Sequence, residues 1–327
     1  MTIVVTGSLA FDYIVQFPGY FKDHIFPDKL HMLSVSFLAD SMRKLRGGCA
    51  ANIAYNLTLV GERPRLVGTV GEDFGDYRAW LEAQGVDTSG ITVVPGELTA
   101  TCFITTDQAS AQFTGFYTGA MAYARNISLR DQPDYRGFDV VIISPNDPAA
   151  MVQFARECRE LGIPYIYDPG QQIIRLSGEE LTDGLTGSRM LILNDYELEM
   201  VKNKTGLTDA DIQERTGILI VTRGEAGSTV YADGQVYDIP IARPRRVVDP
   251  TGAGDAYRAG VIKGLVHGLP PAVLGRLGSL TAVYAVEEYG NQEHRYPLAE
   301  FAARYQENFG PLAGLDQVLA QRRPNPR

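Results

Sequence analysis

The sequence predicts an α/β protein: a doubly wound, mainly parallel sheet with helices on both faces, and a small β-sheet lid. Two observations support this prediction. Short runs of consecutive apolar residues alternate with segments whose small and apolar residues recur at helical spacing, which is typical of strands buried on both faces. Residues 11–45 and 97–119 interrupt this rhythm with short segments in which polar and apolar residues alternate.

In chain order, the apolar runs predict the strands and the periodic segments predict the helices. Strands are expected at Thr2–Val5, Arg65–Val70, Val140–Ser144, Tyr165–Tyr167, Met190–Leu193 and Leu219–Thr222. Helices are expected at Cys49–Val60, Asp76–Gln84 and Ala149–Leu161, each followed by a glycine that can end it. Because ligands bind beyond the carboxyl ends of such strands, chemistry is expected near Gly7, Asn194 and Arg223.

The two interrupting stretches predict four short strands. These are Asp12–Phe17, Leu33–Leu38, Thr101–Thr106 and Gln112–Tyr117, the last two forming a hairpin. We expect them to form a lid over the site, since a lid excludes water during a reaction. The alternative is an extra sheet that only packs on the body or pairs two copies of the chain into a homodimer. No long linker divides the sequence, so residues 1–327 are expected to form a single domain.

Composition argues against several classes of function. The net charge of −9 argues against nucleic acid as a main partner, because affinity for nucleic acid depends on Lys and Arg that neutralise phosphates. No apolar run approaches membrane-spanning length, so no membrane partner is expected. The three cysteines (Cys49, Cys102 and Cys158) lack CxxC spacing and cannot all pair, which favours a reducing, cytoplasmic location.

Common nucleotide-binding and metal-binding signatures are absent from the sequence. Lys204-Thr205 follows Asn203 rather than glycine, so there is no P-loop. The first strand is not followed by Gly-x-Gly-x-x-Gly, which argues against a dinucleotide dehydrogenase. The four histidines have no metal-ligand spacing. An enzyme built from this chain would therefore rely on carboxylates, backbone amides and Mg²⁺.

The most informative motif is Asp249-Pro250-Thr251-Gly252-Ala253-Gly254-Asp255, which precedes a segment with helical spacing. A small-residue turn at a helix start exposes unpaired backbone N–H groups at the positive end of the helix dipole. Such a turn binds anions, phosphate above all, and glycines let the anion approach closely. Asp255 would repel an anion, which is explained if it is a base beside a reacting phosphoryl group. The alternative is an ordinary helix start that Asp255 stabilises through the dipole.

Three further segments accompany this motif across nearly the whole chain. They are Gly47-Gly48-Cys49-Ala50-Ala51-Asn52, Val70–Gly75 followed by Gly85-Val86-Asp87, and Asn194-Asp195-Tyr196-Glu197. In this order the four segments resemble the ribokinase-like (PfkB) family of sugar and nucleoside kinases. Within the family the chain is most similar to the adenosine-kinase-like bacterial branch, on the segments 21–24, 167–172 and 288–294.

The resemblance implies a role for each residue of the 249–255 motif. Asp255 would be the base that takes the proton of the acceptor hydroxyl. The anion hole for the transferred phosphoryl group would comprise Gly252, Ala253 and Gly254 with the amide of Asp255. Asp249 and Thr251 would hold a monovalent cation such as K⁺, although Pro250 stands where many members have Thr or Asn.

On the acceptor side, the resemblance implies that Asp12 holds two sugar hydroxyls, a role that suits a carboxylate accepting two hydrogen bonds. The rest of the sugar site would be Gly47, Gly48 and Asn52. Glycines permit close approach of the sugar, and Asn52 can both donate and accept. The alternatives are a turn carboxylate for Asp12 and, for the glycines, a helix start packed on the first strand.

On the nucleotide side, Asn194 and Glu197 would organise Mg²⁺ through water. Their alternative is a helix N-cap with a carboxylate three residues later. Asn194 would also belong to the ATP-binding residues, together with Thr222, Arg223, Gly224 and Gly227. Arg223 could instead lie on the open surface, and the basic run 243–246 is interpreted as a solvated surface or a nucleotide contact.

The resemblance implies an ATP-dependent kinase that phosphorylates a primary hydroxyl of a nucleoside. Adenosine is expected first, because aromatic residues of the lid could stack on its base; simple lid packing is the alternative for Phe103, Phe113, Phe116 and Tyr117. A kinase for ribose or fructose is a second hypothesis, and a non-catalytic nucleotide or sugar sensor is a third. The joint presence of Asp255, Asn194 and Glu197 argues against a sensor.

Overall fold

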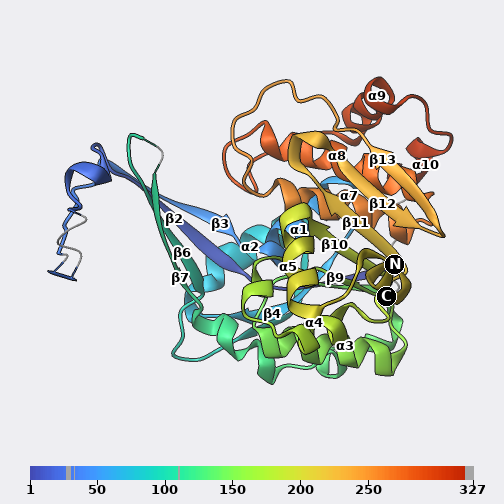
Figure 1. Cartoon of the computed structure of the whole chain (residues 1–327), viewed down its shortest axis with the longest axis horizontal. Helices are drawn as coiled ribbons and strands as arrows, with labels where there is room; N and C mark the ends of the chain where they lie inside the picture. Colours follow the sequence, from blue (N-terminus) through green and yellow to red (C-terminus); the bar gives the residue numbers. More distant parts are fainter. Residues whose placement is uncertain (27–30, 33, 110, 321–327) are drawn as a thin grey trace.

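A nine-stranded sheet forms the body of the protein in the computed structural model, which describes residues 1–26, 31–32, 34–109 and 111–320 (Figure 1). From edge to edge its strands are β13 (Gln235–Ile239), β12 (Ser228–Ala232), β11 (Ile218–Thr222), β10 (Met190–Asn194), β9 (Tyr165–Tyr167), β8 (Phe138–Ile143), β1 (Thr2–Thr6), β4 (Arg65–Val70) and β5 (Asp87–Val93). All pairs from β5 to β11 are parallel, and β12 and β13 add antiparallel strands at one edge. The mainly parallel sheet predicted from the sequence is confirmed.

Helices cover both faces of this sheet. One core contains Ile3 and Val5 and packs under α1 (Cys49–Leu59), α2 (Gly75–Ala83), α7 (Ala253–Val266), α8 (Pro271–Val286), α9 (Leu298–Phe309) and α10 (Leu315–Ala320). The other contains Val4 and packs under α3 (Pro148–Leu161), α4 (Gly178–Leu185), α5 (Asp195–Thr205) and α6 (Asp209–Arg215). Neighbours along β1 thus enter opposite cores, as the two-residue repeat of a strand requires. Among the described helices, none has both the length and the apolar character needed to cross a bilayer.

A second, four-stranded sheet projects from the body, on the left in Figure 1. Its order is β3 (Ser41–Gly47), β2 (Ala10–Gln16), β6 (Ala100–Thr106) and β7 (Gln112–Tyr117). β2 pairs antiparallel with β3 and parallel with β6, and β6 pairs antiparallel with β7. The sequence prediction of a small β-sheet added to the α/β body is confirmed.

The predicted strand Leu33–Leu38 is wrong. Leu33 lies outside the described residues, and residues 34–39 have no strand structure. Phe37 instead packs against Phe17 and Phe21, with ring centroids 4.7 Å and 5.2 Å apart. The strand that completes the sheet is β3, whose sequence Ser-Met-Arg-Lys-Leu-Arg-Gly is mostly exposed and cationic. A strand with little buried surface lacks the hydrophobic alternation on which the prediction depended.

Candidate active site

The turn before α7 has the geometry of a helix start that can bind an anion. Gly252 caps the helix in the left-handed conformation, with φ of 80°. A side chain there would be strained, and a Cβ would lie 2.8 Å from Oδ1 of Asn291. Gly252, Ala253, Gly254 and Asp255 therefore follow one another at the amino end of a 14-residue helix, where the first backbone N–H groups have no intrahelical acceptor.

Asp255 lies in the first turn of α7, and its carboxylate is held from α1. Nδ2 of Asn52 donates to Oδ2 of Asp255 over 2.8 Å. Burial raises the pKa of Asp255 to about 6, against the opposing effects of the Arg258 charge and the Asn52 hydrogen bond. A carboxylate in this state is still ionised near neutral pH and is more basic than an exposed aspartate. Those two properties suit a general base.

Asn52 both donates and accepts hydrogen bonds, and both partners are side chains of the protein. Its side chain is 4% exposed, and its Oδ1 accepts a 2.7 Å hydrogen bond from Nε2 of Gln292. Gln292 also donates to the hydroxyl of Tyr77, which donates to the carbonyl of Gly47. Asn52 is thus placed to orient Asp255, and this contact was not foreseen in the sequence-based assignment of Asn52 to the sugar site.

Asp12 points from β2 toward the loop that follows α8. Its Oδ2 accepts from Nδ2 of Asn291 over 3.0 Å, and burial raises the pKa of Asp12 to about 6. A Cβ on Gly47 would lie 2.4 Å from the same Oδ2, so a glycine is needed to leave space for Asp12. Gly48 has φ of 92°, and a Cβ there would lie 2.5 Å from the carbonyl of Ser8. Close packing of the helix start, the alternative weighed for both glycines, is therefore present at Gly48.

Asn194 ends β10 and Glu197 lies in the first turn of α5, where the two form a capping box. Oδ1 of Asn194 accepts from the amide of Glu197 over 2.7 Å, and Oε2 of Glu197 accepts from the amide of Asn194 over 2.8 Å. Oε1 of Glu197 accepts no hydrogen bond from the described residues. Asn194 is in register with Thr222 on β11, so these two predicted ATP-binding residues are neighbours.

In the loop after β11, the side chain of Arg223 points away from Thr222 while the backbone lies beside it. Arg223 is half-buried and turns toward the β12–β13 hairpin, where it contacts Thr229 at 2.5 Å and Asp238 at 3.4 Å. Gly224 and Gly227 have positive φ, and a Cβ on Gly227 would lie 2.1 Å from the carbonyl of Ile239. Gly227 is therefore explained by packing, while the loop backbone stays beside Thr222.

Asp249 and Thr251 form the turn that precedes the helix start. Oδ1 of Asp249 accepts from the amide of Thr251 over 2.9 Å, and Oδ2 accepts from the amide of Gly290 over 3.2 Å. Each carboxylate oxygen thus already has one backbone partner. Within the described residues, no three acidic, cysteine or histidine side chains are grouped so that they could hold a metal ion.

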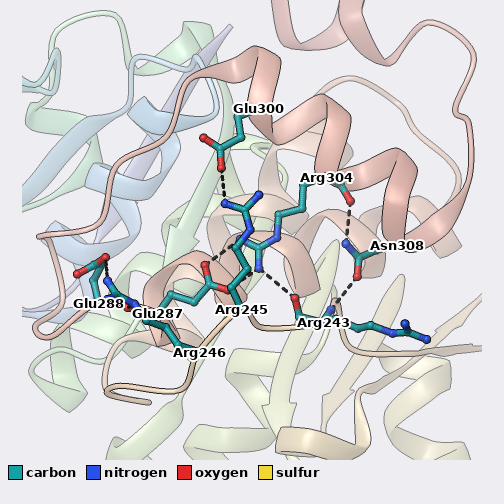
Figure 2. Close-up of polar contacts among 8 residues, drawn as sticks. All are labelled: Arg243, Arg245, Arg246, Glu287, Glu288, Glu300, Arg304 and Asn308. Carbon is teal, nitrogen blue, oxygen red and sulfur yellow. Dashed lines mark hydrogen bonds and ion pairs between the residues drawn. The ribbon is translucent and has the colours of Figure 1, made fainter.

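The basic run 243–246 is held down by the ends of α8 and α9 (Figure 2). Arg245 contacts Glu300 at 3.0 Å, Arg246 pairs with Glu288, and the amide of Arg243 donates to Asn308 over 2.7 Å. The buried Arg304 of α9 makes a two-point contact with Glu287 and donates to the carbonyl of Arg243. The run is an ion-paired surface, the first of the two interpretations offered by the sequence.

Several residues near the predicted site had no role in the sequence-based prediction. Asn291, Gln292 and His294, from the loop after α8, reach Asp12, Asn52 and Asn56 respectively. Asp168, after β9, forms an ion pair with Arg258 of α7. The signal available in the sequence was a cluster of polar residues directly after a predicted strand or a long apolar helix. Only the fold shows that these clusters meet at one place.

The register of the small sheet shows which of its aromatic side chains share a face with Asp12. Asp12 is opposite Cys102 on β6, and Cys102 is opposite Phe116 on β7. Because side chains directly opposite each other point to the same side of a sheet, Phe116 shares the face of Asp12. The other three aromatics lie on the opposite face: Phe103, Phe113 and Tyr117. Phe103 stacks on Tyr13, and Phe113 packs on Phe21.

A surface groove of about 800 Å³ lies elsewhere, between α3, α4 and the end of α5. Its charged lining includes Arg156, Glu179, Asp183 and Lys204, and it contains none of the predicted site residues. Asp183 pairs with Arg159, and Lys204 donates to backbone carbonyls, so these groups already have partners. The groove is therefore not part of the candidate active site.

Comparison with known proteins agrees with this geometry. A model of the pfkB family of carbohydrate kinases matches residues 20–297. A nucleoside kinase of Methanothermobacter thermautotrophicus is 31% identical over 311 residues, which cover 94% of this chain and 96% of that protein. The Burkholderia thailandensis nucleoside kinase in complex with inosine is 36% identical with a TM-score of 0.84, covering 94% of this chain and 98% of that chain. Its ADP-inosine complex is 37% identical with a TM-score of 0.82, covering 94% and 96%. The chain therefore belongs to the pfkB family of carbohydrate kinases.

Proposed function

We propose that this kinase transfers the γ-phosphoryl group of ATP to the primary hydroxyl of a nucleoside. The observation that carries the proposal is the placement of Asp255. It lies in the first turn of α7, beside the anion-binding turn, with its carboxylate fixed by Asn52 and its pKa raised to about 6 by burial. The nucleoside kinases similar to this chain, over more than nine-tenths of its length, support the acceptor class.

In the proposed reaction, Asp255 accepts the proton of the acceptor hydroxyl as the oxygen attacks the γ-phosphorus in line. The amides of residues 252–255 donate to the phosphoryl oxygens, on which negative charge grows in the transition state. Asp12 accepts hydrogen bonds from the ribose diol and so orients the sugar. Asn291 fixes Asp12, and Asn52 fixes Asp255, so both carboxylates are oriented before substrate binds.

Asn194 at the end of β10 and Glu197 in the first turn of α5 fit a magnesium site reached through water. Mg²⁺ prefers oxygen ligands and usually keeps several waters, and Oε1 of Glu197 accepts no hydrogen bond from the described residues. Asn194 and Glu197 would hold the hydrated ion, which when bound neutralises charge on the ATP phosphates. A monovalent cation at Asp249 and Thr251 stays a prediction, and that ion would share a carboxylate already bound to two backbone amides.

The face of the lid that carries Asp12 supports a nucleoside rather than a free sugar. Ile14 and Ile104 share that face with Phe116, which is 49% exposed. An exposed aromatic ring beside apolar side chains can stack on a base, whereas a free sugar would leave this surface uncovered. Adenosine is the acceptor predicted from the sequence. The inosine complex of the B. thailandensis enzyme makes a 6-oxopurine nucleoside an equal candidate.

The extent of the unit and its assembly are further parts of the proposal. We propose that residues 1–327 act as one kinase domain, with segments 11–45 and 97–119 supplying the lid. We propose that two copies pair through the face of the lid opposite Asp12. This face carries Phe103, Phe113 and Tyr117, each close to half exposed. A cytoplasmic location remains an expectation from the three cysteines, which are all free thiols.

The proposal is tested by measuring initial rates of ATP consumption with adenosine, inosine, cytidine, ribose and fructose as acceptors. We expect at least one nucleoside to exceed both free sugars in kcat/KM. Turnover of ribose or fructose with no turnover of any nucleoside would assign the protein to the sugar-kinase class. Binding of ATP and a nucleoside without turnover would favour the sensor hypothesis.

A further inference from the structure

A buried ion pair lies about one helical turn from the proposed base, Asp255. Arg258 follows Asp255 by three residues on α7, so the two side chains lie on the same side of the helix. Nε and Nη2 of Arg258 donate to the two carboxylate oxygens of Asp168, the second over 2.5 Å. The side chains are 11% and 1% exposed. The proposed mechanism gives no role to either residue.

The third nitrogen of the guanidinium reaches the anion-binding turn. Nη1 of Arg258 donates to the carbonyl of Gly254 over 3.0 Å, and this carbonyl belongs to the peptide that carries the amide of Asp255. Every nitrogen of the guanidinium is therefore occupied by Asp168 or Gly254. Burial alone would lower the pKa of Arg258, but the Asp168 carboxylate raises it, so the guanidinium stays charged.

This arrangement keeps a positive charge near Asp255 without a direct bond to it. A guanidinium bound to the Asp255 carboxylate would hold it ionised but would weaken it as a base and occupy the oxygens that the hydroxyl must reach. A guanidinium removed altogether would leave a buried carboxylate without its compensating charge. An opposite charge within about 4–6 Å lowers a carboxylate pKa by about 1–3 units. Both a direct ion pair with Asp255 and the loss of the guanidinium would therefore change the pKa of Asp255 strongly.

We propose that Arg258 and Asp168 are positioning residues of the kinase reaction. Arg258 holds the Gly254 carbonyl and supplies the positive charge that keeps Asp255 ionised, and Asp168 holds Arg258 away from a direct ion pair with Asp255. The proposal rests on the proposed kinase function of the site. It assigns to a segment after β9, 87 residues before Asp255 in the chain, a role in setting the strength of the base.

The groups that face Asp255 come from four elements. On α7 the facing group is Arg258, and on α1 the facing groups are Asn52 and the thiol of Cys49. Asp168 faces it from the end of β9, and Asp12 from β2. Arg258 and Asn52 favour the ionised form of Asp255, whereas the negative charges of Asp168 and Asp12 oppose it. Removal of Arg258 and removal of Asp168 should therefore have opposite effects.

The test is the pH dependence of kcat for Arg258→Gln and Asp168→Asn, measured with the acceptor that the unmodified enzyme phosphorylates. Because the base must be deprotonated, the rate falls on the acidic side with a midpoint at its pKa. We expect Arg258→Gln to move this midpoint up by about 1–3 pH units, so that activity lost at pH 7 is partly recovered at pH 9. Asp168→Asn should move the midpoint down, because the released guanidinium pairs with Asp255.

Arg304→Gln is the matched control. It removes one partner of another buried Arg–carboxylate pair, with Glu287, and neither of these residues is among the groups that shift the pKa of Asp255 (Figure 2). This variant should lose thermal stability without moving the acidic midpoint. If Asp168→Asn does not fold, the double variant Asp168→Asn/Arg258→Gln removes both buried charges and should have a midpoint below that of Arg258→Gln alone.

A second measurement does not depend on turnover. The ¹³C chemical shift of the Asp255 carboxyl, identified by its absence in Asp255→Asn, reports its pKa in the free protein. The proposal requires the same opposite displacements in this titration. Lower stability in both variants with an unmoved Asp255 titration would overturn it and leave a purely structural ion pair. If no acceptor is phosphorylated but the titration moves as expected, the kinase proposal fails while the coupling between these residues stands.

Discussion

Phe116→Ala tests how the acceptor is recognised, because Phe116 is the lid aromatic that shares a face with Asp12. The side chain is 49% exposed, so a stacked base can cover about half of it. A phenylalanine buries roughly 150–250 Å² in full, so the newly covered area is on the order of 100 Å². At about 25 cal/mol per Å², that area corresponds to about 2.5 kcal/mol as an upper value.

Measured base–aromatic stacking contributes about 1–3 kcal/mol, which agrees with this area. We therefore expect Phe116→Ala to lower kcat/KM for the preferred nucleoside by about 5- to 70-fold. The same change should leave kcat/KM for ribose within about twofold, because a free sugar has no base to stack. The assay is a coupled measurement of ADP release at varied acceptor and saturating ATP.

The matched control is Phe103→Ala, which removes an aromatic ring of similar exposure, 50%, from the opposite face of the same sheet. Its loss removes the stacking on Tyr13 and should reduce stability rather than nucleoside selectivity. Equal losses for nucleoside and ribose in Phe116→Ala, or a larger nucleoside-specific loss in Phe103→Ala, would refute the assignment of the substrate-facing side of the lid.

The two carboxylates and the capping box give four other predictions. Asp255→Asn should lower kcat by about 10²–10⁴-fold while calorimetry still detects ADP binding; near-normal kcat would remove the proposed base. Asp12→Ala should weaken acceptor binding by about 1.5–3 kcal/mol with little change in the KM for ATP, and equal losses for both would indicate a disrupted strand. Because burial raises the pKa of Asp12 to about 6, the acceptor KM of the unmodified enzyme should rise as pH falls through 6 and the carboxylate is neutralised. Glu197→Gln should raise the Mg²⁺ concentration for half-maximal rate and lower the melting temperature slightly; a change in melting temperature alone would leave Glu197 with only its capping role.

The parts of the fold predicted best from the sequence are those with strong local signals. Arg65–Val70 and Tyr165–Tyr167 have the predicted bounds, because buried parallel strands read as continuous apolar runs. β3 was missed because it is an exposed, cationic strand that is stabilised by pairing with β2 rather than by a buried face of its own. Its pairing partner is 25–37 residues away in register and leaves no local pattern.

In the candidate site, too, the features with a local sequence signal were predictable and those formed by distant residues were not. The turn before α7 is predictable, because Gly252 is demanded by its left-handed backbone conformation and stands with Gly254 in one short motif. The Asp168–Arg258 pair joins residues 90 positions apart, and neither one stands out within its own segment. Likewise, a capping box and a metal-organising pair have the same Asn-x-x-Glu sequence, so Asn194 and Glu197 could not be assigned to one role from spacing alone.

The most direct test of the central claim is the identity of the product. Purified protein, ATP, Mg²⁺ and inosine or adenosine are incubated, and the product is analysed by ³¹P NMR and mass spectrometry, with Asp255→Asn run in parallel. We predict a nucleoside 5′-monophosphate formed in equal amount to ADP by the unmodified protein, and almost none from Asp255→Asn. ADP formation without a nucleoside monophosphate, or an undiminished yield from Asp255→Asn, would contradict the proposed nucleoside kinase mechanism.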